Sequence, residues 1–192
     1  AGNTDWDQNN VRAMRRVNPP GKYQFFCHDA ERAGLNGLTT GNVNINSITH
    51  PRSGAEQRPT SVNTWLKRNP EYALRFADRA YKHMFHDGAL TAENGMAQWD
   101  ARADGIRVAM KAESARWGDH VDQSPRTLVD FENGLNREYQ RWFPSRTAIT
   151  INQLRAANLY PDIDPPIFSQ HGGTAPDGFG LIITNESGDI YY

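Results

Sequence analysis

The feature that most constrains this fold is a succession of helix-type apolar patterns between residues 69 and 161. The clearest one begins at Asn69 and Pro70, because a capping side chain followed by proline in the first turn is typical of a helix start. Apolar residues then recur at helical spacing up to the breaker Gly88, namely Ala73, Phe76, Ala77, Ala80 and Met84. One face of this segment is therefore predicted to pack against a second layer.

Three more helical patterns follow. The second spans 91–117, with a break near Gly105 left open because glycine weakens a helix interior. The third starts at Leu128 and is predicted to end at Pro144, and the fourth covers 149–154. Four helices with short links predict a compact helical layer.

Short β segments flank these helices. Residues 11–16 and 22–27 are joined by Asn18-Pro19-Pro20-Gly21, which predicts a β-hairpin because proline fixes φ and glycine allows a tight reversal. Residues 34–60 lack a sustained period and are predicted to form a long loop. Beyond Pro161, short strands are expected at 165–168, 179–184 and 189–192. The predicted fold class is α+β, mainly α.

Composition narrows the range of partners. The 192 residues carry 21 basic and 22 acidic side chains, so no global field attracts nucleic acid or an anionic membrane. No run of 18 apolar residues occurs, which predicts no membrane span in this segment. The single cysteine excludes an internal disulfide.

Polar residues near the start have the spacing of a kinase catalytic loop. Asp5 and Asn10 form an Asp-x-x-x-x-Asn pattern, in which the aspartate accepts the proton of the attacking hydroxyl and the asparagine holds a metal ion. Asp29 follows the hairpin, where a kinase fold has its second metal-binding aspartate. Phosphoryl transfer uses this arrangement because the metal neutralises phosphate charge while a separate carboxylate aligns the nucleophile.

Other interpretations of these residues stay open. Asp5 and Asn10 also fit a polar turn whose side chains cap backbone amides, and Asp29 fits a strand-end carboxylate paired with an arginine. An EF-hand starting at Asp5 is disfavoured, because its sixth position would be Asn10 instead of glycine and its twelfth Arg16 instead of glutamate.

Two further clusters have structural explanations beside functional ones. Arg12, Arg15 and Arg16 could meet phosphate or an acidic peptide, although a solvated face is the favoured interpretation. His83 and His86 have a spacing that can bind zinc, but no third ligand is visible in the sequence. We interpret both histidines as ordinary helix residues.

The order of these motifs resembles the core of the CotH family, kinase-like bacterial proteins named for a spore-coat member. Asn3-Thr4-Asp5-Trp6, then Asn10, the hairpin and Asp29 carry the resemblance, which extends to residues 113–119 and 153–161. The resemblance implies that Asp5 is the catalytic carboxylate and that Asn10 and Asp29 bind the metal and the nucleotide. It further implies ATP with Mg²⁺ or Mn²⁺ as cofactors and a serine-type acceptor in a protein substrate.

The resemblance also implies two units within a larger secreted or cell-surface protein, of which this chain is expected to be a fragment. Residues 1–161 would be the C-terminal part of a CotH-like kinase domain, resembling the C-terminal lobe of a kinase and bearing its site on the hairpin. Residues 162–192 would be a linker and the first strands of an incomplete β-sandwich, because 166–192 are similar to the opening of a chitobiase-type sandwich.

Departures from kinase patterns predict that these 192 residues are inactive by themselves. No Gly-rich phosphate loop precedes Asp5, and every lysine follows it, so the phosphate clamp would lie upstream. Asp29 is followed by Ala30-Glu31 and not by Phe-Gly, which separates the chain from ordinary protein kinases.

Two competing functions come from other classes. A catalytically inactive surface scaffold or adhesion module would use the kinase-like lobe only to bind a partner protein. A carbohydrate-binding module would use the sandwich tail and exposed aromatic residues, although Trp6 and Trp117 are better explained as packing anchors. Metal-dependent nucleotide binding separates the enzyme from the scaffold.

Overall fold

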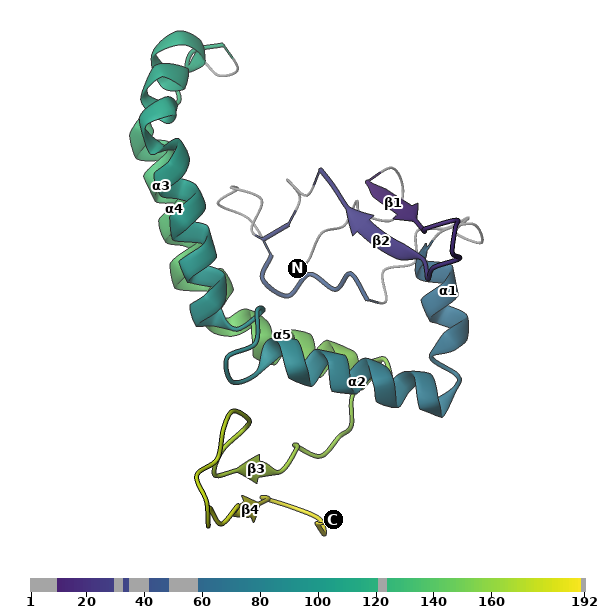
Figure 1. Cartoon of the computed structure of the whole chain (residues 1–192). Helices are drawn as coiled ribbons and strands as arrows, with labels where there is room; N and C mark the ends of the chain where they lie inside the picture. The colour runs from purple at the N-terminus through teal and green to yellow at the C-terminus, as the bar shows by residue number, and fades with distance from the viewer. Residues whose placement is uncertain (1–9, 30–32, 35–41, 49–58, 121–123, 191–192) are drawn as a thin grey trace.

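The computed structural model describes residues 10–29, 33–34, 42–48, 59–120 and 124–190. In this part of the chain helices prevail, and the strands form two separate antiparallel pairs (Figure 1). The predicted class, α+β and mainly α, is confirmed.

The predicted first helix is α2 (Pro70–Met84). The side-chain oxygen of Asn69 accepts hydrogen bonds from the backbone N–H groups of Glu71 at 2.9 Å and Tyr72 at 3.4 Å, which confirms the predicted cap. The helix ends just before Gly88, where a Cβ would lie 2.6 Å from the carbonyl of His83. Only glycine fits this close approach of the returning chain.

The main hydrophobic core lies where α2 meets the end of α5 (Phe143–Ala156) and the segment 157–160. Its buried members are Ala77, Ile151, Leu154, Ala157, Leu159 and Tyr160. Leu159 is only 1% exposed, and half-buried side chains of α2, among them Phe76 and Met84, cover the cluster. The apolar face that the sequence predicts for α2 is therefore the face that packs.

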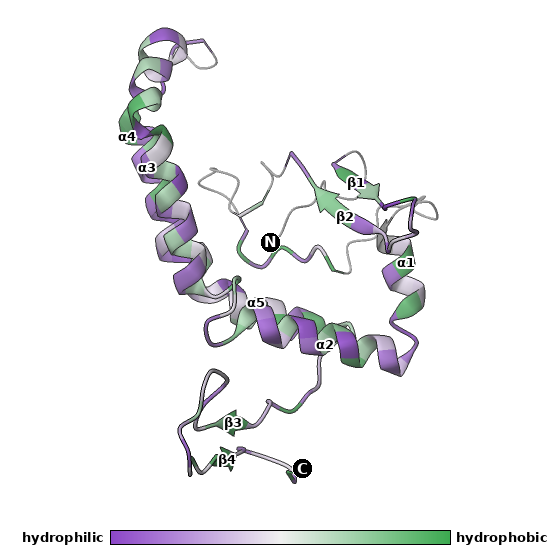
Figure 2. Cartoon of the chain, in the orientation of Figure 1, coloured by the Kyte–Doolittle hydropathy of each residue, from purple (hydrophilic) through white to green (hydrophobic). Residues whose placement is uncertain are grey.

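A second helical pair, α3 (Ala92–Trp117) and α4 (Leu128–Arg137), extends away from this core (Figure 1). The open break near Gly105 does not occur: α3 is one continuous helix, because a single glycine facing open space costs less than the pairing with α4 stabilises. Arg107 of α3 pairs with Glu132 of α4 and with Asp104 on its own helix. Hydrophobic and hydrophilic residues alternate along both helices (Figure 2).

The predicted helix end at Pro144 is wrong. A π-helical turn, η1 (Glu138–Trp142), links α4 to α5 without a break, and Pro144 lies in the first turn of α5. The backbone N–H of Phe143 reaches five residues back to the carbonyl of Glu138, and this wider turn accommodates the proline, which has no N–H to donate. The helical path changes direction here (Figure 1).

The strand predictions hold in part. β1 (Val11–Met14) pairs with β2 (Gln24–Cys27), and β3 (Ile167–Phe168) pairs with β4 (Ile183–Thr184). Residues 189–190 are not in a strand. Helix α1 (Pro59–Leu66) was not predicted and starts within the predicted 34–60 loop, where Pro59 in the first turn was the available signal.

Candidate functional site

The β1–β2 hairpin brings two of the three predicted site residues together. Val11 lies opposite Cys27, and the backbone N–H of His28 donates to the carbonyl of Asn10 at 3.0 Å. The ladder therefore extends one pair beyond the strands and positions Asn10 next to Asp29. The buried side chain of Asn10 donates from Nδ2 to the backbone carbonyl of Asp29 at 3.2 Å.

The backbone of Asp29 is unusual. Its φ is +52°, in the left-handed region that residues other than glycine rarely adopt, and aspartate tolerates it better than most. Its side chain is exposed, while Asn10 next to it is only 7% exposed. The left-handed backbone of Asp29 and the buried amide of Asn10 thus lie side by side at this end of the hairpin. Asp5, the predicted catalytic residue, lies outside the described residues.

The predicted arginine cluster contacts the hairpin itself. Arg12 donates to the carbonyl of Val11, Arg15 lies over the ring of Tyr23 at 5.2 Å, and Arg16 donates to the carbonyl of Pro19 at 3.1 Å. The contacts of Arg15 and Arg16 lie near the turn, that of Arg12 lies at the other end of β1, and all three side chains stay exposed to solvent.

The chain that follows Asp29 passes a buried acid. Glu138, in the π turn, is only 4% exposed, and its carboxylate lies against Gly34. A Cβ on Gly34 would lie 3.0 to 3.2 Å from the carboxylate atoms, and the φ of Gly34 is +68°. Both conditions favour glycine at position 34, where the chain after Asp29 lies against the π turn η1.

Gly34→Ala is expected to lower the free energy of unfolding by about 1–2 kcal/mol, because it adds left-handed strain and crowds Glu138. Urea denaturation measures the change. Gly105→Ala is the matched control, since Gly105 sits in a helix facing open space and alanine there should stabilise by up to about 1 kcal/mol. Equal effects at both glycines would contradict the close contact.

A buried arginine of α5 holds the segment 42–48. Arg146 donates from one terminal nitrogen to the carbonyl of Val43 at 2.7 Å and from the other to the side chain of Gln153 at 3.2 Å. Gln153 donates in turn to the carbonyl of Asn44 at 2.8 Å. Burial lowers the pKa of Arg146, whose guanidinium lies 4.9 Å from the centre of the Trp142 ring. The loop that follows Asp29 thus lies against Glu138 at Gly34 and is hydrogen-bonded by Arg146 and Gln153 at Val43 and Asn44.

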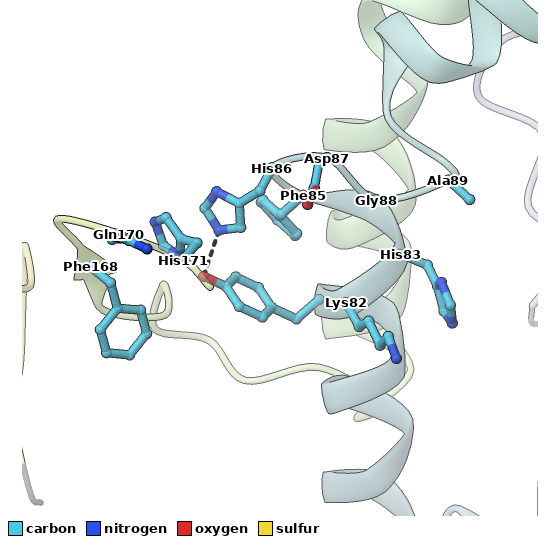
Figure 3. Close-up of a pocket in the computed structure, with 11 residues that line it drawn as sticks. Lys82, His83, Phe85, His86, Asp87, Gly88, Ala89, Phe168, Gln170 and His171 are labelled. Atoms are coloured by element: carbon cyan, nitrogen blue, oxygen red, sulfur yellow. Dashed lines mark hydrogen bonds between the residues drawn. The ribbon is translucent and has the colours of Figure 1, made fainter. Parts of the chain in front are cut away.

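A cluster formed by Tyr81, His86 and His171 was not predicted from the sequence. His86 lies beyond the end of α2, not within it, and its ring stacks on that of His171 with 3.4 Å between the centroids. The hydroxyl of Tyr81 is 2.8 Å from Nε2 of His86, and the residues border a cavity of about 740 Å³ (Figure 3). The aromatic and histidine residues at 81–86 were a signal, but nothing local points to His171.

In the part of the chain that the structure describes, His83 and His86 are not joined by a third side chain that could complete a zinc site. Among the described residues, no three His, Cys, Asp or Glu side chains are grouped so that they could hold a metal ion. His83 points away from the stacked rings (Figure 3).

The two tryptophans that the sequence suggests as packing anchors are only partly described. Trp117 is half exposed and lies under the guanidinium of Arg116, whereas Trp6 is outside the described residues.

The helices of the described residues lack the combination of length and apolar character that a bilayer-crossing segment needs. Comparison with known proteins finds no matching family model, no matching curated protein and no matching solved structure.

Proposed function

We propose that this chain is the metal-binding and catalytic part of a CotH-like kinase that transfers phosphate from ATP to a protein acceptor. The observation that supports the proposal is the contact between Asn10 and Asp29, two residues 19 positions apart that share one end of the hairpin. In this proposal Asp5 aligns the acceptor hydroxyl, while Asn10 and Asp29 bind the cation on the nucleotide.

The donor set fits a hard divalent cation. Mg²⁺ and Mn²⁺ prefer oxygen ligands, and Mg²⁺ is typically bound by one or two carboxylates together with substrate phosphates and water. Asp29 supplies a carboxylate that solvent and nucleotide can reach, and Asn10 supplies an amide oxygen once Nδ2 is committed to the backbone of Asp29. A cluster of three protein carboxylates is not required for such a site. The bound ion would neutralise charge on the phosphates.

The second candidate is a surface scaffold in which the kinase-like lobe binds a partner protein without catalysis. Each helix of the α3–α4 pair exposes a large apolar side chain that a partner could cover: Val108 is 80% exposed and Val129 65% exposed. The localisation that accompanies both candidates is the cell surface or the extracellular space.

Calorimetry with ATP tests the proposal. We expect the 192 residues alone to bind ATP weakly, because they contain no G-x-G-x-x-G phosphate loop, and a form that carries a phosphate clamp to bind ATP only with Mg²⁺ or Mn²⁺. Radiolabelled ATP with a serine-rich protein then measures transfer. Metal-independent binding, or equally tight binding by the 192 residues, would contradict the assignment of Asn10 and Asp29.

A further inference from the structure

The C-terminal strands contact the helical layer through a pair of imidazole rings. His86 follows α2, and His171 follows β3, so the two rings come from opposite sides of the cavity (Figure 3). Their planes are inclined by only 25°, with centroids 3.4 Å apart. At this separation two imidazolium cations repel strongly, whereas two neutral rings, or one neutral and one charged, stack favourably.

The surroundings of the pair fix the two rings differently. Tyr81 shares a hydrogen bond with Nε2 of His86, and the ring of Phe168 lies edge-on to His171 at 5.4 Å. Phe85 packs beside His86 at 6.4 Å. One ring is therefore anchored to the helix side and the other to the strand side, so that the stack itself is the link between them.

Charged groups around the cavity do not offset a second positive charge. The charged or titratable residues that border the cavity near the end of α2, besides His86, are Lys82, His83 and Asp87. On the strand side, among the described residues, His171 is the titratable group at the cavity. Lys82 and His83 point away from the stack (Figure 3). Asp87 alone can compensate one protonated ring, not two.

We propose that the His86–His171 stack is a proton-sensitive latch that docks the C-terminal strands onto α2 at neutral pH and releases them on acidification. Reduced hydration and the nearby charge of His86 lower the pKa of His171 below its ordinary value of 6.5. The docked state thus binds fewer protons than the released state. Docking is complete above about pH 6.5 and weakens as the pH falls below it.

Paramagnetic relaxation in solution tests the latch on the 192-residue chain. A spin label at Thr174→Cys, in a Cys27→Ser background, should broaden the amide signals of residues 82–87 at pH 7.5. At pH 5 we expect the docking equilibrium constant to fall and this broadening to weaken, since the released state binds more protons than the docked state. Imidazole NMR signals report the titration of His86 and His171 directly.

Two variants and one control make the result decisive. His171→Phe keeps a stacked ring without a titrating nitrogen, so it should stay docked at both pH values, and His171→Gln, if the phenylalanine disturbs folding, should lose the pH response as well. His83→Gln, in the last turn of α2 and turned away from the stack, should release like the parent chain. Equal docking of the parent at pH 5 and 7.5, no docking at either pH, or release that persists without His171 would overturn the proposal.

Discussion

Phosphoryl transfer by Asp5→Ala is expected to fall by at least about 100-fold, while ATP affinity changes little. In the proposed mechanism this carboxylate acts on the acceptor hydroxyl as the transition state forms and does not hold the nucleotide. The experiment uses a form of the protein that calorimetry shows to bind ATP, and it compares kcat with the dissociation constant of the metal–ATP complex. Asp78→Ala, on the exposed face of α2, is the matched control and should behave like the parent.

Asp29→Ala should fail in a different way, because in the proposed mechanism its carboxylate binds the ion that bridges the phosphates. Metal-dependent ATP binding and turnover are then expected to weaken together. Circular dichroism must show that both variants remain folded, since an aspartate that only caps backbone amides would cost about 1 kcal/mol of stability. Two folded variants that still transfer phosphate like the parent would refute the assignment of Asp5 and Asp29.

The largest loss of stability is expected for Arg146→Ala, about 3 kcal/mol in the free energy of unfolding. The replacement removes the hydrogen bonds to Val43 and Gln153 and the packing on Trp142, and it leaves the carbonyl of Val43 without this donor. Urea denaturation measures the loss. Hydrogen exchange in 42–48 should increase as well, because this segment is held from α5.

One variant at position 146 separates the geometry of the side chain from its charge, and one variant elsewhere serves as a control. Arg146→Lys keeps the positive charge but not the planar fork that reaches Val43 and Gln153 together, so an intermediate loss is expected. Arg102→Ala removes an exposed arginine of α3 and should change stability by less than about 0.5 kcal/mol. A loss at Arg146 no larger than at Arg102 would contradict the clamp.

Helix and hairpin positions were predictable because their signals are local. The cap at Asn69, the breaker at Gly88 and the turn at 18–21 each act on neighbouring backbone, and the structure contains the corresponding elements. The pairing of Asn10 with Asp29 follows from the same hairpin, because an antiparallel ladder sets its own register. The kinase-like lobe, the two units at 1–161 and 162–192 and the role of Asp5 remain predictions.

By itself, then, the sequence determined the helical segments from residue 69 onward, but not α1, and where the hairpin turns, since period, caps and turn residues act within a few residues. Only the tertiary structure decided that Pro144 would lie inside a continuous helical path, because the π turn before it redirects α5 toward the core. It also decided the contacts of Glu138 with Gly34, Arg146 with Val43 and His86 with His171. Such contacts join residues far apart in the chain, and their formation depends on how whole elements pack, which no local pattern encodes.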